Sequence, residues 1–173
     1  EGHAALGLAR IARARGRAEQ ALTWLRLTEE RFKGQGEVAQ VAHITIEHAR
    51  LALMAGRLDE ANRLVGEALR QAQEAIAVGG ARGPVALANA VWGGVALAYG
   101  RLDQARAHAH EARTLAEREA DDLALVEAAL LVAEVELLAD NLQAAVNAYN
   151  QAQALSQARE ATVADALTSV GLG

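Results

Sequence analysis

Cysteine is absent from the 173-residue sequence, and proline occurs only once, at Pro84. Without cysteine the chain can form no disulfide, no thiolate nucleophile and no cysteine-ligated metal site, which is typical of an intracellular protein. We therefore expect a cytoplasmic protein. Proline disrupts helix interiors, because it lacks an amide N–H and its ring clashes with the preceding turn. Its near absence leaves almost the whole chain free to form helices.

Aromatic residues make up only 3% of the sequence, although hydrophobic residues as a class make up 52%. Alanine and leucine supply most of this apolar surface, in stretches that also contain arginine, glutamate and glutamine. These side chains lose little entropy in a helix, whereas the runs of β-branched residues that are typical of strands are missing. The composition predicts an all-α protein with closely packed helices.

An excess of positive charge is also absent, since the formal net charge is −5. A nucleic-acid-binding protein usually shows a basic balance or a basic stripe, so we expect no direct binding of nucleic acid. The sequence has no apolar run as long as a membrane span and no recognisable signal peptide, so we expect no membrane association. The chain begins with Glu1 rather than Met and stops abruptly, which favours a single domain cut from a larger protein.

A six-residue word recurs along the chain. It reads GRAEQA at 16–21, GRLDEA at 56–61 and GRLDQA at 100–105, with a degenerate copy, DNLQAA, at 140–145. The closing alanines are 61 − 21 = 40, 105 − 61 = 44 and 145 − 105 = 40 residues apart. Even spacing of this kind is typical of a helical repeat protein.

Each copy of the word predicts a tight turn between two helices. Glycine ends the first helix in a left-handed conformation that other residues adopt at a cost, and Asp140 tolerates such turns better than most. An acidic residue in the next first turn is favourable at the positive end of the helix dipole. The closing alanine is small because another helix passes close to it. We expect first helices at about 2–15, 37–55, 85–99 and 122–139, second helices at about 18–33, 58–77, 102–119 and 142–159, and a tail helix at about 161–170.

The pattern resembles the tetratricopeptide repeat. That family has a small residue seven positions before the turn and another seven positions after the closing alanine. The first position holds Ala9, Ala49, Gly93 and Ala133, and the second holds Thr28, Ala68, Ala112 and Ala152. The proline that ends the family's unit is missing, and the period of 40 to 44 exceeds the usual length of about 34. Longer units of this kind look like the repeats of the MalT-like regulators, bacterial proteins of the LuxR class.

The resemblance implies a right-handed superhelix, or α-solenoid, of four helix-turn-helix units plus a C-terminal helix. It also implies a concave groove lined by the first helices. Carrying the family's concave positions onto this sequence predicts the groove residues His3, Arg10, Arg13, His43, Ile46, Arg50, Leu53, Met54, Leu87, Leu97, Glu127, Leu130 and Glu134. The charged positions change from basic in the first two units to acidic in the fourth.

Two interpretations of these charges stay open. In one, the arginines and histidines recognise an acidic group on a partner and the leucines and Met54 supply apolar contact. In the other, the charges only solvate the inner face or pair across neighbouring units. Gly94, which follows Gly93 in the same helix, is expected to face the groove, where it either makes room for a ligand or partner or is a tolerated defect.

No constellation for catalysis, metal or cofactor emerges from the sequence. His108 and His110 lie two residues apart, so on a helix they do not share a face. The segment 79–84, GGARGP, lacks the Gly-Lys-Ser/Thr ending of a phosphate-binding loop. We expect a non-catalytic interaction or sensor module of a larger signalling or transcriptional regulator, with no cofactor and no metal. The alternatives are a free-standing scaffold for proteins or peptides, a sensor of a small effector, and a self-association module that forms homo-oligomers.

Overall fold

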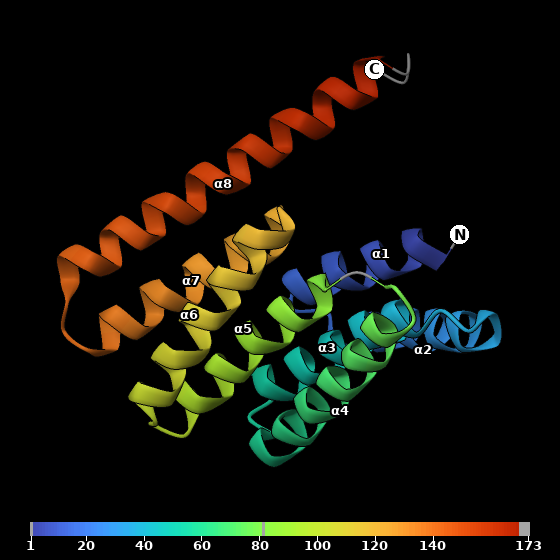
Figure 1. Ribbon diagram of the computed structural model, residues 1–173, viewed down its shortest axis with the longest axis horizontal. Coiled ribbons are helices and arrows are strands. Elements are labelled where there is room, and N and C mark those ends of the chain that lie inside the picture. Colours follow the sequence, from blue (N-terminus) through green and yellow to red (C-terminus); the bar gives the residue numbers. More distant parts are fainter. Residues whose placement is uncertain (1, 81, 170–173) are drawn as a thin grey trace.

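The computed structural model describes the backbone of residues 2–80 and 82–169, and side chains as far as residue 160 (Figure 1). This part of the chain is all-α: it contains eight helices and no strand. The helices are α1 (Gly2–Ala14), α2 (Ala18–Gln35), α3 (Val38–Met54), α4 (Leu58–Ala77), α5 (Gly83–Ala98), α6 (Leu102–Glu119), α7 (Asp122–Leu138) and α8 (Leu142–Ser169). Among the residues described, no helix is both long and apolar enough to cross a membrane.

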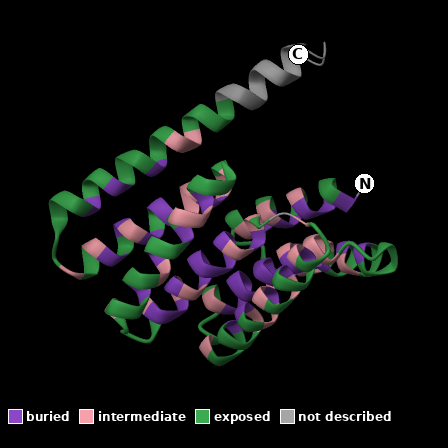
Figure 2. Cartoon of the chain, in the orientation of Figure 1, coloured by how far each residue is buried: buried purple, intermediate pink, exposed green. Residues whose placement is uncertain are grey.

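The helices pack as four consecutive pairs. Each odd-numbered helix packs against the even-numbered helix that follows it, and α2, α4 and α6 each pack against the first helix of the next pair. The odd-numbered helices also contact one another in order, α1 with α3, α3 with α5 and α5 with α7. Buried residues concentrate where the helices face one another, and most residues of α8 between 142 and 160 are exposed (Figure 2). The odd-numbered helices therefore form one continuous row.

The four predicted turns share one geometry. Gly16, Gly56 and Gly100 have φ between 70° and 72°, and Asp140 has φ 60°, so all four are left-handed as predicted. In each turn the next residue's N–H donates to a carbonyl five positions earlier, for example Arg57 N to Ala52 O at 2.9 Å and Asn141 N to Glu136 O at 2.9 Å. These are the bonds of the Schellman motif, which satisfies carbonyls that the helix end would leave unpaired.

The small residues predicted for helix contact are buried. The closing alanines of the four words are at most 2% exposed, and the small positions on the first helices are equally covered. Gly93 shows why size matters there, because a Cβ atom on it would lie 2.2 Å from Cδ2 of Leu131 on α7. Alanine and glycine thus let the helices approach closely, as the repeat predicted.

The predicted break before a tail helix is wrong. We expected one helix at about 142–159 and another at about 161–170, but α8 is continuous from Leu142 to Ser169. The reason is local, because residues 142–169 contain neither glycine nor proline, the two residues that most readily end a helix. The four pairs are present, and their last helix takes in the expected tail.

Candidate binding face on the odd-numbered helices

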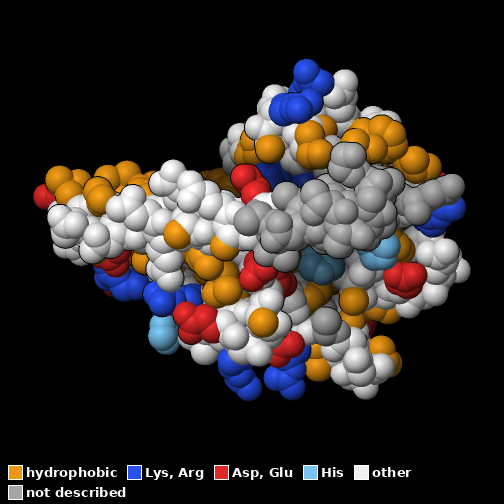
Figure 3. Space-filling model, turned by 90° about the horizontal axis from the view of Figure 1, so that it is seen from above, with side chains coloured by type: hydrophobic (Ala, Val, Ile, Leu, Met, Phe, Trp, Pro, Cys, Tyr) orange, Lys and Arg blue, Asp and Glu red, His pale blue; other side chains and the backbone are white. Residues whose placement is uncertain are grey.

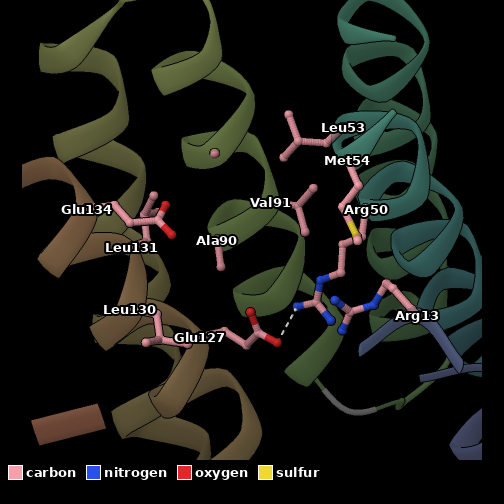
Figure 4. A pocket seen from close by; sticks show the side chains of 11 residues that line it. Arg13, Arg50, Leu53, Met54, Ala90, Val91, Glu127, Leu130, Leu131 and Glu134 are labelled. Atoms are coloured by element: carbon pink, nitrogen blue, oxygen red, sulfur yellow. Dashed lines mark ion pairs between the residues drawn. The ribbon is translucent and has the colours of Figure 1, made fainter. Parts of the chain in front are cut away.

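Three cavities lie along the row of odd-numbered helices. The central one has a volume of about 240 Å³ and takes side chains from α1, α3, α5 and α7 (Figure 4). A cavity of about 350 Å³ lies among α1, α3, α5 and the start of α7, and another of about 350 Å³ lies between the ends of α5 and α7. We call the residues that line these three cavities the inner face.

Twelve of the thirteen residues predicted for the groove line these cavities. The cavity among α1, α3, α5 and the start of α7 is lined by His3, Arg10, His43 and Leu87. The central cavity is lined by Arg13, Arg50, Leu53, Met54, Glu127, Leu130 and Glu134. The cavity between the ends of α5 and α7 is lined by Leu97 and again by Glu134. Ile46 is the exception and is corrected here: it is 1% exposed and belongs to the core with Val65 and Ala68. Leu87 borders a cavity but is 0% exposed and belongs to the same core, so its predicted apolar contact with a partner is corrected as well. The helix α3 packs against α1, α2, α4 and α5, which leaves little of its surface open.

A buried carboxylate organises the basic part of the inner face. Glu47, on α3, has only 2% of its side chain exposed. It accepts hydrogen bonds from Arg10 Nε at 3.0 Å, Arg13 Nε at 2.9 Å and Arg50 Nη1 at 2.9 Å. Residues from α1 and α3 that are far apart in the sequence therefore meet at one carboxylate. We did not predict Glu47 as part of the site, although it is the lone acidic residue of the otherwise largely apolar stretch 41–54.

Arg50 also makes an ion pair across the inner face. Its Nη2 lies 3.2 Å from Oε1 of Glu127 on α7, and the two side chains point toward one another across the central cavity (Figure 4). Its side chain is 7% exposed, Nη1 donates a hydrogen bond to Glu47, and the contact of Nη2 with Glu127 is an ion pair without a hydrogen bond, so Arg50 is a structural residue. Pairing of charges across neighbouring units is seen instead for Arg10 and Arg13 of the first unit, which both reach Glu47 of the second. Arg50 pairs with Glu47 of its own unit and with Glu127 of the fourth. Arg10 and Arg13, whose side chains are 28% and 22% exposed, line the cavities.

The surroundings of the titratable groups set their charge. Burial alone would raise the pKa of Glu47, but the coulombic attraction of the three arginines outweighs it and holds that pKa below its ordinary value. Burial, assisted by Arg10, lowers the pKa of His43 to about 4, so this histidine is neutral at pH 7. Its Nδ1 is buried without a hydrogen-bond partner among the described residues. His43 therefore adds no positive charge for an acidic partner.

The last unit adds acidic and apolar groups. Burial, and secondarily the neighbouring charge of Glu127, raise the pKa of Glu134. Around it the exposed fractions of apolar side chains are high, at 47% for Leu137 and 66% for Leu138, and Met54 on α3 is 60% exposed. Gly94 lines the central cavity as expected, and a Cβ atom on it would lie 3.1 Å from Cδ2 of Leu53. The inner face thus combines accessible leucine and methionine with fixed charges.

The histidines that we set aside as metal ligands lie outside this face. His108 stacks on Trp92, with ring centroids 4.8 Å apart, and its Nδ1 lies 3.1 Å from Asn89 Oδ1. In the part of the chain that the structure describes, no group of three or more histidine, aspartate or glutamate side chains is placed to hold a metal ion.

The chain was compared with known proteins. No protein-family model matches it, and no curated protein matches its sequence. Among solved structures it is similar to BtubC (BKLC) from P. vanneervenii, with a TM-score of 0.59 and 19% sequence identity. The similarity covers 92% of this chain and 64% of the BtubC chain, so this chain spans less than two thirds of that length. At this identity the likeness concerns the helical fold alone.

Proposed function

We propose that this chain is a non-catalytic protein-interaction module. Its units would form a right-handed superhelix of tetratricopeptide-like pairs, and the inner face would bind a peptide or helix of a protein partner. The four equivalent turns and the continuous row of odd-numbered helices support this arrangement. The repeat length further suggests, through the resemblance to MalT-like regulators, that the module belongs to a larger signalling regulator.

The observation that carries the proposal is the combination of groups on the inner face. Arg10 and Arg13 are held in place through Nε by the buried Glu47, while Met54 and Leu138 stay largely exposed. Side chains that are ordered before binding lose less entropy when a partner arrives. Such a face suits a segment that carries a carboxylate beside apolar side chains, because the arginines supply register and the apolar groups supply affinity.

The shape of the face favours a peptide over a small effector. Small-molecule sites are usually single concave pockets of about 300–1,000 Å³ that enclose most of the ligand. Here three cavities of about 240 to 350 Å³ follow one another along the helices, and Glu134 lines both the central one and the one between the ends of α5 and α7. An elongated ligand can occupy several of them at once, and a compact one cannot.

Selection from a displayed library of random peptides tests the proposal with a defined probe. The wild-type chain should enrich peptides that combine Asp or Glu with leucine-like residues. Changing the acidic residue of a selected peptide to its amide should weaken binding about tenfold, because a charged hydrogen bond is lost. Binding would be followed by fluorescence anisotropy.

Matched variants locate the binding. Met54→Glu and Leu138→Glu place a charge on exposed positions of the inner face and should each abolish binding of the selected peptides. Val78→Glu is the control, since Val78 is 82% exposed and lines none of the three cavities. A library that yields no enriched peptide, or peptides whose binding responds equally to all three substitutions, would show the proposal to be wrong.

A further inference from the structure

Side chains of opposite charge line the central cavity. The guanidinium groups of Arg13 and Arg50 lie on one side of it, and the carboxylates of Glu127 and Glu134, both on α7, lie on the other (Figure 4). The two guanidinium groups are neighbours, because Arg13 Nε and Arg50 Nη1 donate to the two oxygens of one carboxylate, that of Glu47. The cationic and anionic sides meet where Arg50 Nη2 lies 3.2 Å from Glu127 Oε1.

Arg50 carries a hydrogen-bond donor that the fold does not satisfy. Its side chain is 7% exposed, and Nη2 is buried without a hydrogen-bond partner within the described residues. Buried polar atoms nearly always have such a partner, and an unsatisfied one costs free energy. An acceptor atom of a ligand at Nη2 would remove this cost. The neighbouring Arg13 donates to Glu47 through Nε, which leaves its Nη atoms for the same ligand.

Glu134 is an acceptor without a donor. In the part of the chain that the structure describes, its carboxylate makes no hydrogen bond and no ion pair. Burial and the nearby charge of Glu127 both raise its pKa, so the fold does not compensate its negative charge. A cation placed against Glu134 and Glu127 would supply this compensation.

The rest of the lining of the central cavity is apolar. It includes Val91 and Leu131, which are 5% and 4% exposed, and Met54, which is 60% exposed. The cavity thus has a buried apolar wall and an accessible apolar rim. Its volume of about 240 Å³ equals that of roughly eight water molecules in the liquid. A ligand of about eight or nine non-hydrogen atoms, the size of leucine, would fill it.

The closeness of the opposite charges selects a class of ligand. Because Arg50 Nη2 and Glu127 Oε1 are 3.2 Å apart, a ligand that pairs with both sides must carry its own two charges close together. An α-amino acid carries its ammonium and carboxylate groups on one carbon atom, whereas a peptide bond removes one of the two charges. On the face seen in Figure 3, positive and negative side chains are interspersed without a large area of one sign. That face therefore offers no surface for binding through net charge.

We propose that the central cavity binds a free aliphatic α-amino acid. The carboxylate of the ligand accepts hydrogen bonds from Arg50 Nη2 and Arg13, and its ammonium group donates to Glu127 and Glu134. The aliphatic side chain packs on the apolar wall formed by Val91 and its neighbours. The ligand fills the central cavity alone, so this binding does not depend on the proposed peptide binding.

Isothermal titration calorimetry of the wild-type chain with L-leucine, L-isoleucine, L-valine and L-methionine tests the proposal. At least one of them should bind saturably with a 1:1 stoichiometry. Two analogues of L-leucine that are no larger each lack one charge: leucinamide has no carboxylate, and 4-methylpentanoate has no ammonium group. Each should bind about tenfold more weakly than L-leucine, because a charged hydrogen bond is lost.

Glu134→Gln locates the ammonium group. This variant should bind L-leucine about tenfold more weakly and should bind 4-methylpentanoate as the wild type does, because that analogue has no ammonium group to lose. Circular dichroism should show unchanged helix content, since no described residue depends on the Glu134 carboxylate. Glu117→Gln is the matched control: Glu117 is 53% exposed, does not line the central cavity, and should leave binding unchanged.

Three results would overturn the proposal. The first is the absence of saturable binding of all four amino acids at millimolar concentration. The second is binding of leucinamide as tight as that of L-leucine, which would assign the acidic side of the cavity to the amino-terminal residue of a peptide. The third is an equal effect of Glu134→Gln on L-leucine and on 4-methylpentanoate. Selection of peptides is measured separately, so none of these results decides the proposed peptide binding.

Discussion

Glu47 carries a charge in a place where water cannot solvate it. Its carboxylate has 2% of its side chain exposed and accepts hydrogen bonds from three guanidinium groups. Burial of an isolated charge is strongly unfavourable, and hydrogen-bonded partners of opposite sign must offset the cost. Arg10 and Arg13 come from α1, so this one side chain joins the first helix pair to the second.

Glu47→Gln should therefore destabilise the fold. The amide keeps the volume of the side chain but removes the charge, and breaking such a buried pair costs about 3 kcal/mol. Urea denaturation at neutral pH would measure the loss. Glu117→Gln is the matched control, because Glu117 makes a single ion pair with Arg113 and is 53% exposed. The control should change stability by less than about 0.5 kcal/mol, and similar losses in the two variants would contradict the assignment.

The difference in unfolding free energy between wild type and Glu47→Gln should depend on pH. The folded-state pKa of Glu47 is lowered, so the folded state favours the ionised form. Its contribution to stability is present above the ordinary carboxyl pKa of about 4 and is lost as the pH falls through the lower folded value. The difference between wild type and Glu47→Gln should consequently shrink in acid.

Individual helices approach closely because of single small residues. Gly93 in α5 is the clearest case, since Leu131 of α7 occupies the space where a Cβ atom would stand. Glycine within a helix costs about 1 kcal/mol relative to alanine. The contact between α5 and α7 thus outweighs the helical preference of the residue that makes it possible.

Two glycine substitutions should shift stability in opposite directions. Gly93→Ala should destabilise by about 1–3 kcal/mol, because overpacking forces the neighbouring side chain or helix to move. Gly66→Ala, in the middle of α4 and with no atom within 4 Å of the added Cβ, should stabilise by about 0.5–1 kcal/mol. Thermal or urea unfolding of both variants would check this. Stabilisation by Gly93→Ala would mean that α5 and α7 are not in close contact.

The turns were predictable from sequence because their determinants are local. A left-handed residue and a closing alanine lie within six positions, and both features appear in the structure at all four copies. The family positions likewise placed most of the inner face. The role of Glu47 was not predictable in this way, because its partners Arg10 and Arg13 are more than 30 positions away and their approach depends on how α1 packs against α3. Ile46 was wrongly placed for a similar reason, because its burial depends on how α3 packs against the helices around it.

The whole molecule is a row in which each pair contacts its neighbours. The central helices are covered on both sides, whereas α8 contacts α7 and no other helix within the described residues. Its buried side chains among residues 142–160 are Ala145, Ala148 and Ala152. In such a row, the free energy of unfolding is approximately the sum of contributions from each helix pair and from each interface between neighbouring pairs. Local unfolding begins where a helix makes the fewest contacts.

Hydrogen exchange should follow this arrangement at concentrations where the chain is monomeric. Backbone amides of residues 153–160 in α8 should exchange fastest among the helical amides of residues whose side chains are described, because no buried side chain opposes local opening there. Amides of α3 and α5 should exchange most slowly. Mass spectrometry of proteolytic fragments would resolve the two classes. Equal protection of α8 and α5 would show that the molecule opens as one unit.

The ion pair between Arg50 and Glu127 acts as a strut between two helices whose backbones do not pack against each other. It spans α5 and so links the second helix pair to the fourth. A charged group that enters the central cavity competes directly for either end of this strut. We therefore expect a charged group in the central cavity to replace one ionic contact with another without bending either helix.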